Sequence, residues 1–106
     1  MAKPRVKVPE TAVAGDIITI KAIISHSMES GHRQDKQGQT IARNIINSFK
    51  CEFNGAVFFS CDIHTGISAN PFFEFNARVD KAGTFRFIWT DDDGVVTELE
   101  KTIALE

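Results

Sequence analysis

Apolar and polar residues alternate with a period of two along most of the chain, and turn-forming residues bound each alternating run. This pattern is typical of strands that bury one face. The second run begins near Gly15-Asp16 and places its apolar side chains on one face, namely Ile18, Ile20, Ala22 and Ile24. Ile17 and Ile23 lie on the opposite face of the same strand, so that face is predicted to be partly apolar as well.

Further alternating runs follow to the end of the chain. They contain the residues Val6 and Val8; the hairpin around Asn54-Gly55; Phe73, Phe75, Ala77 and Val79; Phe85, Phe87 and Trp89; and Leu99, Ile103 and Leu105. About seven strands joined by short turns predict an all-β, antiparallel, immunoglobulin-like β-sandwich. At 106 residues the chain is expected to form one domain spanning residues 1–106.

The register of the central hairpin depends on its turn. A two-residue loop pairs Phe53 with Ala56, whereas a three-residue loop pairs Phe53 with Val57. Only the longer loop gathers the apolar residues of both strands on one face, so we predict the three-residue loop.

The predicted register also fixes the surroundings of the two cysteines. Cys51 is expected opposite Phe59, and Cys61 opposite Phe49. The cysteines are then diagonal neighbours about 7–8 Å apart at Cα, which is at or beyond the reach of a disulfide. We therefore predict two buried, free and unreactive thiols.

The charge balance narrows the possible partners. Twelve basic and fourteen acidic residues give a net charge of -2, and no basic block is present, which disfavours nucleic acid as a partner. No apolar run approaches the ~20 residues needed to span a membrane. The stretch MAKPRVKVPE contains no apolar h-region, so we expect no secretory signal.

The stretch IISHSMESGHRQD, residues 23–35, is rich in groups that could bind a metal. His26, Met28 and His32 form one candidate copper set, and Cys61 with His64 forms another, although a blue-copper site would need further ligands. The alternative is that these histidines are solvated loop and strand-end residues. Residues 29–40 contain no large apolar side chain, and such a long loop is either functional or mobile. Asp91-Asp92-Asp93-Gly94 is predicted to be a turn rather than a calcium loop.

Apolar residues on outward faces indicate a binding module. Ile46 and Phe58 are predicted to point away from the core on one face of the hairpin. Ile17, Ile23 and Ile88 lie on the weaker faces of their strands. The alternative is that loops or sheet twist cover these side chains.

The chain resembles the SoxZ family, the non-catalytic half of the SoxYZ carrier of thiosulfate oxidation. Ser27 departs from the proline expected in the family's loop. The resemblance is carried by the ordered stretches PRVKVPETAVAGDIITIKAIISHSMESGHRQD, RNIINSFKCEFNG, ANPFFEF and AGTFRFIWTDDDG.

This resemblance implies a heterodimer with a SoxY-like chain that carries the sulfur intermediate on a cysteine near its C-terminus. The present chain ends in KTIALE and is expected to supply no carrier thiol, no cofactor and no enzymatic activity. Transient contacts with SoxAX, SoxB and SoxCD-type enzymes are implied too, as is a periplasmic location reached by export with a signal-bearing partner.

Two surfaces are the candidates for these contacts. We expect the permanent partner on the face of Ile46 and Phe58. The transient contacts are assigned to the polar loop, through the residues His26, Met28, Glu29, His32 and Arg33. A copper-binding periplasmic sandwich is the alternative function. We also expect that the isolated chain can self-associate through the vacant partner face.

Overall fold

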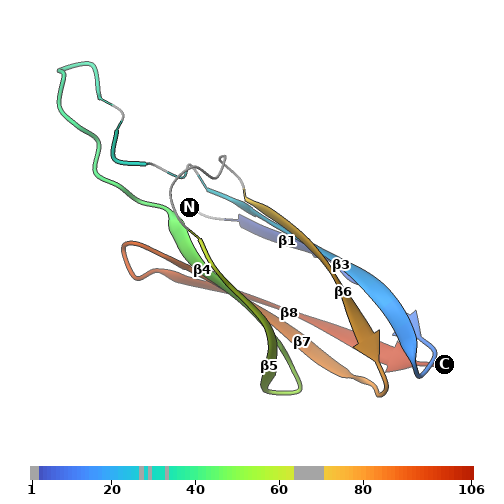
Figure 1. Cartoon of the computed structure of the whole chain (residues 1–106). Coiled ribbons are helices and arrows are strands. Elements are labelled where there is room, and N and C mark those ends of the chain that lie inside the picture. Colours follow the sequence, from blue (N-terminus) through green and yellow to red (C-terminus); the bar gives the residue numbers. More distant parts are fainter. Residues whose placement is uncertain (1–2, 27, 29, 33, 64–70) are drawn as a thin grey trace.

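A computed structural model describes residues 3–26, 28, 30–32, 34–63 and 71–106 (Figure 1). The strands are β1 (Lys3–Lys7), β2 (Thr11–Ala12), β3 (Asp16–Ser25), β4 (Ile46–Phe53), β5 (Ala56–Asp62), β6 (Phe72–Val79), β7 (Gly83–Asp91) and β8 (Val96–Leu105). None of the described residues belongs to a helix of sufficient length and hydrophobicity to span a lipid bilayer.

The strands form two sheets that pack face to face. One sheet has the order β1-β3-β6 and the other has the order β2-β8-β7-β4-β5. The pairings are antiparallel except that β2 runs parallel to the end of β8. The prediction of an all-β sandwich is confirmed. The structure has one strand more than the seven predicted, namely the two-residue β2.

The core lies between the sheets and follows the predicted alternation. The four predicted inward residues of β3 are buried, and so are Phe85, Phe87 and Trp89 on β7. Phe49 of β4 lies among aromatic rings from both sheets, with its centroid 4.6 Å from that of Phe73 and 5.2 Å from that of Trp89. The aromatic side chains therefore bridge the two layers.

The central hairpin differs from its predicted register near the turn. Phe53 pairs with Ala56, so the loop has two residues, and both Asn54 (φ 52°) and Gly55 (φ 87°) adopt the left-handed conformation that tight hairpin turns require. The prediction of a three-residue loop was wrong.

A β-bulge restores the predicted pairs further along the hairpin. The register shifts between Cys51 and Glu52, so that Val57 and Phe58 together face Glu52. Beyond the bulge Cys51 lies opposite Phe59, as predicted, and Cys61 lies opposite Phe49. There the apolar residues of both strands share the buried face, as predicted, but an extra residue in β5, rather than a longer loop, gives this register.

A second bulge corrects the prediction for Ile46. The register of β4 against β7 shifts between Ile46 and Ser48, so Asn47 is the extra residue. Because side chains alternate with a period of two, one inserted residue moves Ile46 to the core face. Ile46 is only 2% exposed and therefore does not share an outward face with Phe58.

Both cysteines have free thiols, as predicted, but their burial differs. Cys51 is fully buried, whereas Cys61 is partly exposed. Burial, and to a lesser extent the nearby Glu52 carboxylate, raises the pKa of the Cys51 thiol to about 12.

The segment between β3 and β4 extends beyond the sandwich as an arm (Figure 1). Near its tip the Asp35 carboxylate accepts hydrogen bonds from the backbone N–H groups of Gln37 and Gln39, and Gln34 forms an isolated bridge with Thr40. The molecule measures 58 × 20 × 19 Å along its principal axes. The arm thus has a defined turn at its tip.

Candidate partner-binding surfaces

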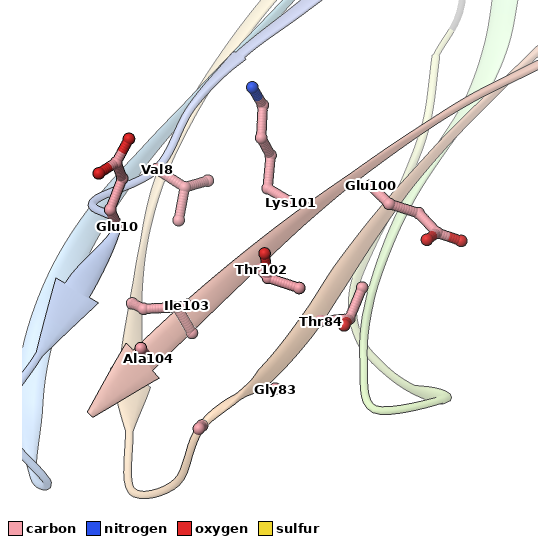
Figure 2. A pocket seen from close by; sticks show the side chains of 10 residues that line it. Val8, Glu10, Gly83, Thr84, Glu100, Lys101, Thr102, Ile103 and Ala104 are labelled. Carbon is pink, nitrogen blue, oxygen red and sulfur yellow. The ribbon is translucent and has the colours of Figure 1, made fainter.

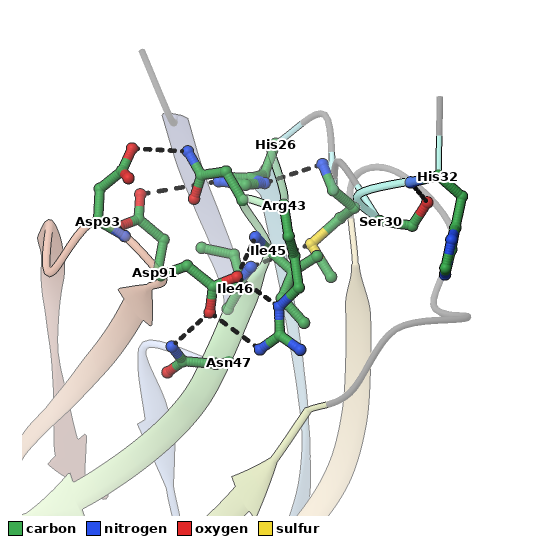
Figure 3. A network of polar contacts seen from close by, with 12 residues as sticks. His26, Ser30, His32, Arg43, Ile45, Ile46, Asn47, Asp91 and Asp93 are labelled. Carbon is green, nitrogen blue, oxygen red and sulfur yellow. Dashed lines mark hydrogen bonds and ion pairs between the residues drawn. The ribbon is translucent and has the colours of Figure 1, made fainter. Parts of the chain in front are cut away.

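The turn after β7 anchors a polar network at the arm end of the sandwich (Figure 3). Asp92 accepts hydrogen bonds from Arg43 Nε at 2.7 Å and Arg43 Nη2 at 3.2 Å. The side chain of Asn47 donates to the same carboxylate at 3.0 Å, and the backbone N–H of Ile45 donates at 3.3 Å. One carboxylate therefore fixes the path of the chain into β4.

These contacts keep Asp92 ionised. The hydrogen bond from Arg43 lowers the pKa of Asp92 well below its ordinary value, and the bonds from Asn47 and Ile45 act in the same direction against partial burial. The same hydrogen bond raises the pKa of Arg43. The Asp92 side chain is 17% exposed and the Arg43 side chain is 49% exposed, so solvent weakens the ion pair itself. The several hydrogen bonds to the less exposed carboxylate hold this end of the fold together.

Asp91 shapes the turn itself. Its Oδ1 accepts hydrogen bonds of 3.0 Å from the backbone N–H groups of Asp93 and Val95, and Gly94 adopts a positive φ of 80°. This is the geometry of an Asx-type turn. The prediction of a turn at this acidic run is confirmed.

His26 and Met28 belong to the same network. His26 Nε2 lies 3.7 Å from Asp91 Oδ2, and His26 Nδ1 accepts a hydrogen bond from the backbone N–H of Met28. Met28 has a left-handed backbone with φ 53°, and its Sδ accepts the backbone N–H of Ile46 at 3.2 Å. Both side chains thus hold the start of the arm against the sandwich.

This burial overturns the assignment of His26 and Met28 as recognition groups. The side chain of His26 is 8% exposed and Met28 is 8% exposed, so a docking protein does not reach them. His32 is exposed, and its backbone N–H lies 3.4 Å from Ser30 Oγ (Figure 3). Glu29 and Arg33 lie outside the described residues.

The copper sets gain no support from this geometry. His26 Nδ1 and Met28 Sδ already accept backbone hydrogen bonds, and the exposed His32 is separated from His26 in Figure 3. Within the described part of the chain, no group of three His, Cys, Asp or Glu side chains is arranged to hold a metal ion. His64, the proposed companion of Cys61, lies outside that part.

The edge of the sandwich at β5 is apolar and exposed. Val57 is 53% exposed and Phe58 is 43% exposed. The Phe58 ring has its centroid 6.1 Å from that of Phe75 and 5.9 Å from that of Phe85. Phe58 therefore borders the core at the open side of the sandwich, rather than projecting from an outer sheet face.

A hollow of about 710 Å³ lies at the end opposite the arm (Figure 2). The β6–β7 turn and the last residues of β8 form one wall, and Val8 and Glu10 form the other. Glu10 and Glu100 offer carboxylates and Lys101 offers an ammonium group. This mixed and open lining shows no convergent set of groups for a small ligand.

Sequence reasoning missed the network around Asp92. Two signals in the chain pointed to it: Arg43-Asn44 lies one residue before β4, and the acidic run begins with the last residue of β7. Because β4 and β7 are antiparallel neighbours, the start of one lies beside the end of the other. The sequence pattern did not reveal that β4 and β7 are neighbours, and the network could therefore not be predicted.

Taken together, the features define an all-β sandwich whose conspicuous polar groups brace one end of the fold while an apolar edge stays exposed. The same fold occurs in several solved structures. Superoxide reductase (neelaredoxin) from Ignicoccus hospitalis superposes with a TM-score of 0.78 at 17% identity, over 97% of this chain and 80% of that chain. The sulfur carrier protein SoxY from Chlorobium limicola f thiosulfatophilum gives a TM-score of 0.70 at 11% identity, over 97% of this chain and 78% of that chain.

The CARDB domain of PF1109 from Pyrococcus furiosus, solved in complex with di-metal ions, gives a TM-score of 0.59 at 12% identity, over 100% of this chain and 94% of that chain. These identities are low, so the likenesses show the fold alone. A search of curated protein sequences finds no match.

A protein-family model described as "Sulphur oxidation protein SoxZ" matches residues 6–102. The chain belongs to the SoxZ family. The family predicted from the four sequence stretches is thereby confirmed, and with it a role in sulfur oxidation.

Proposed function

We propose that this chain is the non-catalytic subunit of a SoxYZ-type sulfur carrier. It pairs with a SoxY-like chain, which bears the sulfur intermediate on its own cysteine. The observation that carries the proposal is the SoxZ family match over residues 6–102. In this proposal the subunit supports the fold of its partner and supplies part of the surface on which the Sox enzymes dock.

The state of the thiols supports the assignment of the chemistry to the partner. A nucleophilic or carrier cysteine needs an accessible thiolate. Cys51 is fully buried, and its pKa of about 12 keeps it protonated at neutral pH. Cys61 packs partly against the core, and its Sγ lies 3.5 Å from the carbonyl oxygen of Asp62.

The β5 edge is the surface that we assign to the permanent partner. β5 is the last strand of its sheet, so an exposed row of backbone groups accompanies the apolar side chains of Val57 and Phe58. An exposed apolar edge favours association, and obligate interfaces are apolar. The bulge at Val57 and Phe58 gives this edge a local shape that a specific partner can match.

Val57→Asp tests the assignment. Val57 is 53% exposed and belongs to an edge strand, so a buried carboxylate should split the heterodimer while the free chain still folds. Val96→Asp is the matched control, because Val96 is also 53% exposed and also lies in a strand. Co-expression with a SoxY-like chain and tandem affinity purification measure the pairing.

We expect partner recovery to fall at least about tenfold for Val57→Asp and to stay near wild type for Val96→Asp, since a charge buried at an interface costs several kcal/mol. If both variants recover as much partner as the wild-type chain, the β5 edge is not the interface with the permanent partner. Failure of the wild-type chain to pair at all would reject the proposed function. Phe58→Asp is the less specific probe, because the Phe58 ring also contacts Phe75 and Phe85 in the fold.

The proposal includes transient docking of SoxAX, SoxB and SoxCD-type enzymes. The exposed residues of the arm, among them His32, are available for such contacts. It also includes a periplasmic location, reached together with a signal-bearing partner. Cell fractionation with and without the signal of the partner tests that location, and a chain that stays in the cytoplasm in both cases rejects it.

A further inference from the structure

The outer face of the three-stranded sheet is basic. Alternation along β1 turns Lys3, Arg5 and Lys7 to the side opposite the half-buried Val6. The next strand adds Lys21, which pairs in register with Lys7. Three of these four basic residues lie within the five residues of β1, and the pairing of β1 with β3 adds the fourth.

Little in the described chain neutralises these groups. Lys21 lies 3.6 Å from Glu74 on β6, whereas the described residues supply no ion pair to Lys3, Arg5 or Lys7. Four basic side chains thus share this region with one carboxylate, although the whole chain has a net charge of -2.

The outer face of the five-stranded sheet has the opposite character. Glu98 and Glu100 point outward from β8, and Glu52 points outward from β4. Arg86 lies between them and pairs with both Glu98 and Glu52. The sandwich therefore separates its charge, with an excess of basic groups on one sheet and of acidic groups on the other.

An apolar centre accompanies the basic groups. Arg5, Ile23 and Phe72 form one row across the three strands, and Phe72 is 55% exposed. Shallow hollows flank this row, lined on one side by Lys7 and Lys21 and on the other by Lys3 and Ser25. Exposed aromatic and arginine side chains at the centre of a patch are typical of protein interfaces.

We propose that this basic face, formed by Lys3, Arg5, Lys7, Lys21, Ile23 and Phe72, docks an acidic surface of an enzyme that visits the carrier transiently. The inference rests on the proposed function and names the chemistry of the visiting partner. Complementary charges accelerate encounter more than they strengthen a permanent complex. A carrier that must bind and leave several enzymes gains from such a surface.

The fold allows this docking while the permanent partner is bound. β1 lies at one edge of its sheet and β6 at the other. β5 lies on the β6 side, because Phe59 stacks on Phe75 with centroids 4.4 Å apart. A partner on the β5 edge therefore leaves the basic strand β1 accessible.

The double variant R5E/K7E tests the inference within the assembled heterodimer. The matched control is K50E/K81E, which changes the net charge equally at two exposed lysines away from the basic face. The assay is thiosulfate-dependent cytochrome reduction with purified SoxAX- and SoxB-type enzymes, recorded from low to high salt. At low salt we expect kcat/KM for the carrier to fall about tenfold in R5E/K7E, and to stay within about twofold of wild type in the control.

Salt provides the second readout. Wild-type kcat/KM should decline as salt screens the attraction, and the R5E/K7E curve should be flatter and meet it at high salt. Equal losses in R5E/K7E and the control would overturn the inference, as would a wild-type rate independent of salt. So would R5E/K7E-sensitive binding to phosphatidylglycerol vesicles with unchanged turnover, which would assign the face to a lipid surface. A wild-type chain that does not pair with a SoxY-like chain removes the proposed function, and this inference with it.

Discussion

The polar end of the sandwich and its β5 edge differ in what their residues do. At the polar end, side chains typical of chemistry, such as His26, Met28 and Asp92, are engaged within the fold. At the β5 edge, side chains typical of a core, Val57 and Phe58, are exposed to solvent. Residue type alone therefore does not distinguish the side chains that are engaged within this fold from those that are exposed; their backbone partners and their exposure do.

The largest effect is expected from Asp92→Ala at the polar end. The variant leaves Arg43, Asn47 and the Ile45 N–H without their shared acceptor, which should cost about 2–3 kcal/mol of unfolding free energy. Urea denaturation measures it. Asp93→Ala is the control. The exposed Asp93 carboxylate accepts a side-chain hydrogen bond from Asn44, and its loss should cost less than about 1 kcal/mol.

The role of Asp92 should also be visible in the dependence of stability on acidic pH. The pKa of Asp92 is lowered in the folded state, so its contribution to stability is fully present above the ordinary value of 3.8 and is lost as the pH falls below it. Asp92→Ala should therefore flatten the acid limb of stability against pH. An unchanged acid limb would show that Asp92 does not brace this end.

An alkaline loss of stability is expected from Cys51. The folded thiol has a pKa of about 12 against an ordinary value of 9.0, so the unfolded chain releases this proton first. The free energy of unfolding should then decrease by about 1.4 kcal/mol for each pH unit above 9, so that the total loss at pH 10.5 is about 2 kcal/mol. Thermal denaturation of Cys51→Ala should lack this slope, whereas Cys61→Ala should keep it.

The two histidines of the arm should differ. His26→Ala removes the acceptor of the Met28 N–H and the contact with Asp91, and should cost about 1–2 kcal/mol. His32→Ala changes an exposed side chain and should stay within about 0.5 kcal/mol. Chemical denaturation of both variants measures the difference, and equal costs would contradict the division into bracing and exposed groups.

The smallest effect concerns the turn that leads into β5. A Cβ on Gly83 would lie 2.2 Å from the side-chain oxygen of Asn54, and that oxygen accepts the Thr84 N–H. Gly83→Ala should expel the Asn54 side chain at a cost of about 1 kcal/mol. In Asn54→Gly, which suits the positive φ, the same Gly83→Ala change should cost nearly nothing. Additive costs in this double-mutant cycle would exclude the contact as the cause.

Most of the fold was predictable, because burial of one face per strand imposes the period of two. The exceptions occur at bulges. The alternation could not reveal that Asn47 is an extra residue, so Ile46 was assigned to the wrong face. Phe58 was predicted to point away from the core. It is 43% exposed, but its bulged position directs it to the open side of the sandwich, where its ring lies beside Phe75 and Phe85.

The polar end was less predictable for a different reason. His26, Met28 and His32 look equivalent in sequence, and only the proximity of Asp91 and Ile46 distinguishes them. The packing of the two sheets against each other creates that proximity, since Asp91 and Ile46 belong to one sheet and His26 and Met28 follow a strand of the other. The basic face depends in part on strand pairing, since Lys7 and Lys21 are far apart in the chain and become direct partners when β1 pairs with β3.

The arm has a consequence for the hydrodynamic behaviour of the molecule. The Cα radius of gyration is 16.2 Å, whereas a compact chain of this length has one of about 13 Å. In gel filtration a single chain should therefore elute with compact proteins of about twice its mass. Sedimentation equilibrium, which does not depend on shape, should return 11.8 kDa for that same species. Agreement of elution with a dimer, combined with a monomer mass in the centrifuge, would be the signature of the extended arm.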